Sequence, residues 1–114
     1  MSRSRNSRLA VLSSRLSRRS FTPVDALGNP HGVRYTFRTT NPAHVTLQVV
    51  NARGRVVRSW AYKSAHARYR SVSWLGHTDS GSIARPGTYH FRVRLSLFGT
   101  TRYGGARRVN VRAA

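Results

Sequence analysis

Two segments of this chain alternate apolar and polar residues with a period of two. In residues 89–97 the apolar positions are Tyr89, Phe91, Val93, Leu95 and Leu97, separated by His90, Arg92, Arg94 and Ser96. In residues 33–40 the apolar positions are Val33, Tyr35 and Phe37, separated by Arg34, Thr36 and Arg38. Successive side chains of a β-strand point to opposite faces of its sheet, so each segment predicts a strand with one buried and one solvated face.

Shorter segments predict further strands at residues 45–49, 55–62, 69–74 and 109–111. Asn51–Gly54 has the composition of a hairpin turn that ends on a left-handed glycine, and residues 76–87 form a long Gly- and Ser-containing loop. Trp60 and Tyr62 fit either the core or an exposed aromatic surface. Residues 21–114 contain no competing helical pattern, so the sequence predicts an all-β antiparallel sandwich of about seven strands.

Residues 1–20 differ from the rest because they are mostly Ser and Arg. Leu9, Leu12 and Leu16 have helical spacing, which allows a basic amphipathic helix on a membrane or RNA surface. Three leucines bury too little area to offset the entropy of ordering, so we expect residues 1–20 to be a disordered basic tail before a domain at 21–114. The apolar run Leu9–Leu12 is too short for a membrane span or a convincing signal peptide.

The inventory of reactive side chains argues against an enzyme. The chain has no cysteine, and Asp25 and Asp79 are its only carboxylates. The five histidines have no metal-ligand spacing; they are His31, His44, His66, His77 and His90. No nucleophile elbow accompanies the serines. We therefore predict no catalytic residue, no metal and no cofactor.

Two segments resemble a known family. They run from Val45 to Arg58, with the Asn51–Gly54 turn, and from Trp74 to Tyr89, with Gly76, Gly81 and Pro86-Gly87 in the family's positions. Both are similar to the immunoglobulin-like (FlgD-like) domain of the bacterial flagellar hook-capping protein. That module also occurs in secreted and cell-surface bacterial proteins. Leu75 stands where the family usually has Asp.

The resemblance implies an immunoglobulin-like fold and a non-catalytic structural or adhesive module of a bacterial envelope, flagellar or secreted protein. It also implies an extracellular or cell-surface location and a protein partner.

The alternative function is polyanion binding. Lys and Arg number 21 against 2 Asp and Glu, a formal net charge of +19. The near absence of lysine also fits codon bias in a GC-rich genome, but codon bias does not explain the missing acids. Such a charge suits nucleic acid or an acidic wall polymer, although no RNA-recognition signature is present. The candidate contacts are Arg34, Arg38, Arg58, Arg92, Arg94, Arg108 and Arg112.

Overall fold

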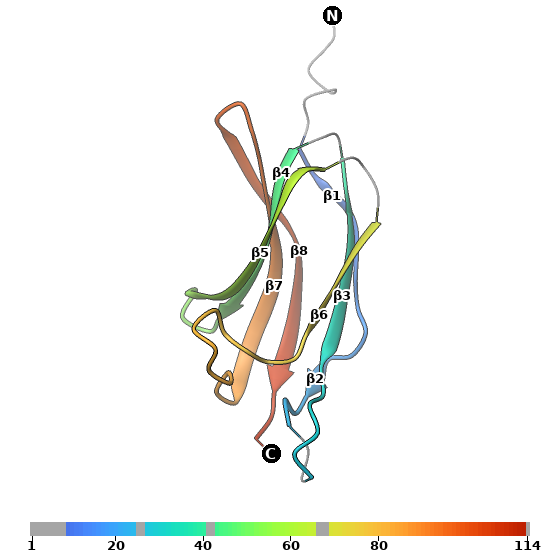
Figure 1. Ribbon diagram of the computed structural model, residues 1–114. Coiled ribbons are helices and arrows are strands. Elements are labelled where there is room, and N and C mark those ends of the chain that lie inside the picture. Colours follow the sequence, from blue (N-terminus) through green and yellow to red (C-terminus); the bar gives the residue numbers. More distant parts are fainter. Residues whose placement is uncertain (1–8, 25–26, 41–42, 66–68, 114) are drawn as a thin grey trace, which may run out of the picture.

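The computed structural model describes residues 9–24, 27–40, 43–65 and 69–113, and these residues form eight β-strands and no helix (Figure 1). The strands are β1 (Val11–Leu16), β2 (Ser20–Phe21), β3 (Val33–Thr39), β4 (Ala43–Asn51), β5 (Val56–Ala65), β6 (Tyr69–Trp74), β7 (Gly87–Leu97) and β8 (Thr100–Val111).

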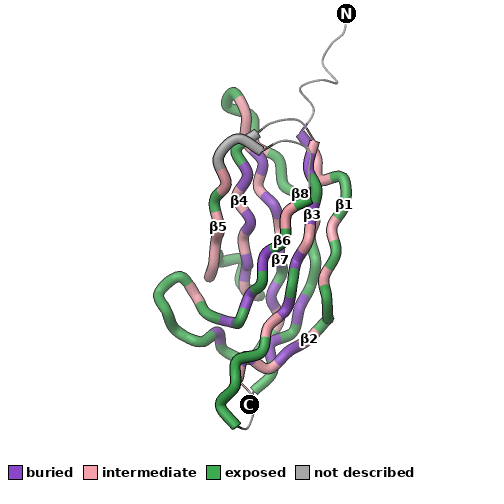
Figure 2. Tube along the Cα trace, turned by 45° about the vertical axis from the view of Figure 1, so that its right-hand side comes forward, coloured by how far each residue is buried: buried purple, intermediate pink, exposed green. Residues whose placement is uncertain are grey.

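The strands build two sheets. One has three strands in the order β1-β3-β6, and the other has five in the order β2-β8-β7-β4-β5. All neighbours are antiparallel except β2 and β8, which are parallel. The buried positions alternate along the strands and lie between the two sheets, while the outer faces are exposed (Figure 2). The predicted all-β sandwich is confirmed.

The prediction of a disordered tail is wrong for residues 11–16, which form β1. β1 pairs with β3 from Val11 opposite Thr39 to Leu16 opposite Tyr35, and its Leu16 packs against the core. The alternative of an amphipathic helix is wrong for the same residues. A bulge between Val11 and Ser13 shifts the register, so the sequence of β1 lacks a clean alternation. The prediction for residues 1–8 lies outside the described residues.

The core is centred on Trp74, the last residue of β6. Its side chain is 1% exposed, and its ring meets Phe21, Tyr89 and Phe91 edge to face at centroid distances of 5.4–5.8 Å. The indole Nε1 donates a hydrogen bond of 2.9 Å to the carbonyl of His77. Edge-to-face packing stabilises aromatic clusters, and the bonded indole has no unsatisfied donor.

The predicted turns are present, but two strands are longer than predicted. Gly54, the last residue of the Asn51–Gly54 turn, has φ +82°. Hydrogen bonds to the Asn51 side chain hold the shape of this turn. β5 runs on to Ala65, and β8 begins at Thr100 instead of near Arg108.

Gly104 and Gly105, in the middle of β8, let the backbone of this strand lie close to side chains of β1 and β3. The chain bulges there, opposite Phe91–Val93 of β7. The Tyr35 hydroxyl donates a hydrogen bond of 2.6 Å to the Gly105 carbonyl, and a Cβ on Gly105 would collide with that hydroxyl. Only a residue without a side chain fits here.

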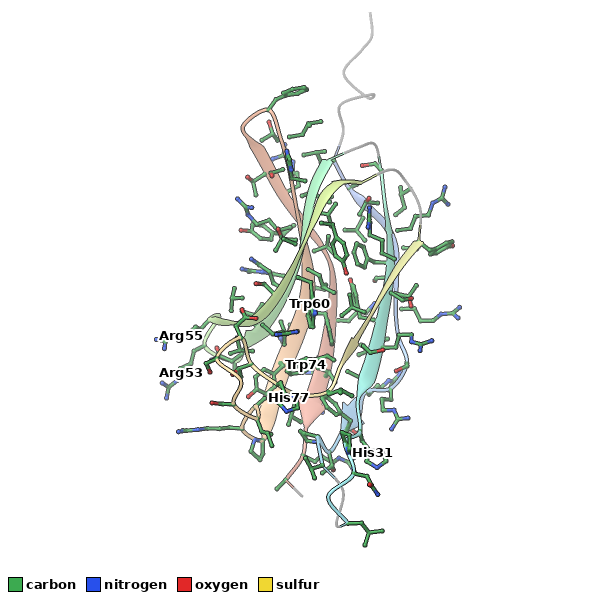
Figure 3. The ribbon with its side chains drawn as sticks, in the orientation of Figure 1. His31, Arg53, Arg55, Trp60, Trp74 and His77 are labelled. Atoms are coloured by element: carbon green, nitrogen blue, oxygen red, sulfur yellow. The ribbon has the colours of Figure 1, made fainter. Side chains whose placement is uncertain are left out.

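Trp60 and Tyr62 belong to the margin of the core. In β5 they lie opposite Leu47 and Val45, which are buried, so their rings face between the sheets. Trp60 is labelled in Figure 3. Both rings pack against the core and are partly buried. The open question about their faces is thereby answered, and the exposed aromatic surface is ruled out for this pair.

Candidate functional site

Asp79 is the acidic residue within the described part of the chain, and it holds the loop that contains it, between β6 and β7, against the edge of β5. Its backbone N–H donates to the Val57 carbonyl, and its side chain accepts from the Ser59 backbone N–H at 3.3 Å. It also pairs with Arg58 at 3.5 Å. Through these contacts the loop folds back on β5.

The described histidines are exposed and lie apart on different strands and loops. No group of three His, Asp, Glu or Cys side chains among the described residues is placed to hold a metal ion. Asp25 and His66 lie outside the described residues. No helix in the described part of the chain is long and apolar enough to cross a membrane.

Three of the predicted arginines share the outer face of the five-stranded sheet. Arg92 and Arg94 alternate with the buried residues of β7, and Arg108 of β8 lies opposite His90 on the same face. Arg92 is held in place: its Nε donates to the Gln48 side chain at 2.8 Å, and its guanidinium lies 4.5 Å from the centre of the Tyr103 ring. This outer face is therefore a basic surface with one ordered arginine.

The other predicted arginines lie elsewhere. Arg34 and Arg38 project from the outer face of β3 in the opposite sheet, since their neighbours in β3 are buried. Arg58 lies at the margin of the core, where it stacks on Trp60 at 4.9 Å and pairs with Asp79. Arg112 is exposed just past the end of β8. The seven predicted positions thus divide among both sheets and do not form one surface.

Sequence reasoning missed a second grouping, in which Arg108 lies with three arginines that it did not name, because it placed residues 1–20 outside the domain. A groove of about 610 Å³ follows the seam where β1 of one sheet lies against β8 of the other. Its polar lining consists of Ser14, Arg15, Arg19, Arg107, Arg108 and Asn110. We call the groove with this lining the seam groove.

The floor of the seam groove is tied together by Arg107. Its Nε donates to the Ser14 hydroxyl and its Nη2 to the Ser14 carbonyl, both at 2.9 Å. Behind this contact lies the buried Tyr35. Burial raises the pKa of Tyr35 to about 12, although a hydrogen bond with Ser14 and the charge of Arg107 act in the opposite direction. The seam is therefore a well-packed part of the fold.

Comparison with solved structures supports the fold. FlgD from P. aeruginosa is similar with 23% identity and a TM-score of 0.56, over 89% of this chain and 71% of that one. Dimeric latent PorU from Porphyromonas gingivalis is similar with 20% identity and a TM-score of 0.58, over 75% of this chain and 9% of that one. The chain thus spans a small part of PorU. At these identities, the likeness concerns the fold.

A comparison with curated protein sequences gives no match. Among the protein families, residues 26–97, more than half of the chain, match the one described as the FlgD Ig-like domain. This match includes both segments that carry the sequence resemblance, from Val45 to Arg58 and from Trp74 to Tyr89. The chain belongs to the family of FlgD Ig-like domains.

Proposed function

We propose that this chain is a non-catalytic structural or adhesive module of a bacterial envelope, flagellar or secreted protein, that it works outside the cell and that it binds a protein partner. The observation that carries the proposal is that residues of the two family segments stabilise the fold. Trp74 fills the core, Asn51 shapes a turn, and Asp79 fastens a loop to β5. The side chains that define the family are thus occupied in building the sandwich, which is the pattern of a scaffold.

The location is tested by protease treatment of intact cells that express the full-length protein with an epitope tag. A surface or secreted module is degraded in intact cells or recovered from the medium, while a cytoplasmic control protein survives. Protection of the tagged protein until the cells are lysed would contradict the proposed location.

The structural role is tested by co-purification with chemical cross-linking from the cell envelope. A structural module is recovered with a stoichiometric protein partner, and the cross-links map to its described strands. Recovery of the protein as an unattached monomer in the envelope fraction would contradict this part of the proposal.

A second candidate function is binding of a polyanion through the arginines of the sheet faces. Arg92, Arg94 and Arg108 on one outer face support it, because they lie together with no described carboxylate on that face. Arginine charge of this kind attracts polyanions strongly at low salt and more weakly as salt rises.

This second candidate is tested by titration with a short single-stranded oligonucleotide and with an acidic wall polymer at two salt concentrations. Arg92→Gln with Arg94→Gln should weaken both, and the slope of log K against log salt should fall. If wild-type protein binds neither polymer at low salt, the candidate is refuted. Equal weakening by charge removal anywhere on the molecule would reduce it to bulk attraction.

A further inference from the structure

We propose that the seam groove is a binding site for closely spaced phosphate groups, as in a diphosphate or oligophosphate. This inference deepens the polyanion candidate, on which it rests for the general attraction, but it names a different place and, apart from Arg108, different residues. The seam groove exists only because β1 folds against the sandwich, so it could not be found while residues 1–20 were expected to be a tail.

The walls of the seam groove come from both sheets. Arg15 belongs to β1 of the three-stranded sheet, Arg108 to β8 of the five-stranded sheet, and Arg19 to the segment that carries the chain from one sheet to the other. Arg107 fixes the spacing between the walls through its two hydrogen bonds to Ser14. Four guanidinium groups from three chain segments therefore line one concave surface.

These charges are uncompensated within the described part of the chain. The carboxylate of Asp79 pairs with Arg58, which lies in β5 away from the seam groove. No hydrogen bond or ion pair among the described residues engages the side chains of Arg15, Arg19 or Arg108. Like charges held near one another destabilise the fold, and a bound anion would relieve that repulsion.

The four guanidinium groups of the seam groove favour phosphate over carboxylate as the bound anion. A guanidinium presents N–H donors in a planar fork that matches two oxygens of a phosphate. A single carboxylate carries one negative charge and offers two oxygens, too few for four cations. Two linked phosphates offer more charge and more oxygens, and the Ser14 hydroxyl and the Asn110 amide line the same groove as neutral partners.

The absence of aromatic side chains from this lining separates the seam groove from a single-strand nucleic-acid site. Its lining consists of arginines, Ser14, Leu16, Ala106 and Asn110. Proteins that bind single strands without sequence preference stack bases on aromatic rings, and none is present here. The seam groove thus favours recognition of the phosphates themselves.

The test is isothermal titration with inorganic pyrophosphate at constant ionic strength, with sodium acetate as the carboxylate arm and an oligothymidylate without terminal phosphates as the phosphodiester arm. We expect pyrophosphate to bind more tightly than acetate and oligothymidylate. Each charge-assisted hydrogen bond accounts for roughly tenfold in affinity, so Arg15→Gln with Arg19→Gln should weaken pyrophosphate binding by at least about tenfold.

The matched control is Arg53→Gln with Arg55→Gln. It removes the same charge from the exposed turn between β4 and β5, whose arginines project away from the sandwich (Figure 3). This control should change pyrophosphate affinity by less than about twofold, since charges beyond a Debye length are screened. Thermal unfolding in phosphate-free buffer checks that every variant is folded, and Arg108→Gln, from the opposite wall, replaces the double variant if that one is unstable.

The outcomes separate this inference from the polyanion candidate. If the two double variants weaken pyrophosphate binding equally, or if pyrophosphate binds no better than acetate, the seam groove is not a phosphate site. If oligothymidylate binds more tightly than pyrophosphate and its binding depends on Arg15 and Arg19, the choice of clustered phosphates is overturned. Polymer binding that depends on Arg94, together with pyrophosphate binding that does not depend on Arg15 or Arg19, would leave the polyanion candidate standing while the seam groove fails.

Discussion

The contact between Tyr35 and Gly105 predicts a specific energetic coupling. Gly105 has φ +66°, and a Cβ there would collide with the Tyr35 hydroxyl that bonds its carbonyl. For Gly105→Ala we expect a cost of about 1 kcal/mol for the left-handed backbone and about 2 kcal/mol more for displacing the hydroxyl and breaking its buried hydrogen bond.

Tyr35→Phe removes the obstacle together with the hydrogen bond, at a cost of about 1.5 kcal/mol. In that background, Gly105→Ala should cost only about 1 kcal/mol for the backbone. The double variant should therefore lose about 2.5 kcal/mol of unfolding free energy, against about 4.5 kcal/mol if the two changes were additive. The coupling of about 2 kcal/mol measures the closeness of β8 to β3.

The assay is equilibrium unfolding in urea, followed by tryptophan fluorescence, for the wild type, both single variants and the double variant. Gly54→Ala is the matched control. Gly54 has φ +82°, and a Cβ there would meet nothing within 4 Å. It should cost about 1 kcal/mol in either background. If Gly105→Ala costs no more than Gly54→Ala, or if the cycle shows no coupling, the described packing of the seam is wrong.

Three further predictions follow from the core, the loop and the tyrosines. Trp74→Phe should lower the unfolding free energy by about 2–3 kcal/mol, because it leaves a cavity and an unpaired His77 carbonyl; a urea midpoint equal to wild type would contradict this. Asp79→Ala should cost about 1 kcal/mol and uncover the edge of β5; sedimentation velocity should then show increased self-association, and an unchanged monomer would count against the covering role. Burial raises the pKa of Tyr35 to about 12 and also raises the pKa of Tyr62 and Tyr89, so the native state favours their neutral forms. This stability is complete below about pH 10, the pKa of an unfolded tyrosine, and is lost as pH rises through the folded values. Urea unfolding between about pH 9 and 12 should show a decline that is smaller in Tyr35→Phe, and equal declines would refute the assignment.

Much of the sandwich could be predicted from sequence because its central strands have one buried face and one more exposed face. β3 and β7 alternate buried and more exposed positions, and in β4 Val45, Leu47 and Val49 are all buried as expected. The turn at Asn51–Gly54 could be predicted for a different reason, since it depends on the local chemistry of Asn51 and Gly54.

β1 could not be predicted, because its stability comes from partners far away in the chain. Its sequence Val11–Leu16 carries two serines and an arginine, and the bulge breaks its periodicity. What orders it is pairing with β3 and the Arg107 hydrogen bonds to Ser14, whose partners are 93 residues apart. Tertiary contacts thus override weak local propensity.

The same limit applies to the candidate sites. The alternation of β7 predicted that Arg92 and Arg94 point outward, and it did so correctly. It did not predict that Arg58 faces the margin of the core, since Val56 and Val57 give that strand an ambiguous parity. The seam groove depends on β1 and was therefore beyond the reach of the sequence.

The central claim is that residues 11–16 are an integral strand of a FlgD-like sandwich, and native-state hydrogen exchange tests it most directly. The backbone N–H of Thr40 donates to Ala10 and that of Ser17 to Arg34, at the two ends of the pairing between β1 and β3. Amides of this pairing should exchange orders of magnitude more slowly than in an unfolded chain, with protection like that of β6 at the other edge of the sheet. Exchange at unfolded-chain rates throughout residues 11–16, with β3 and β7 protected, would contradict the claim and remove the seam groove with it.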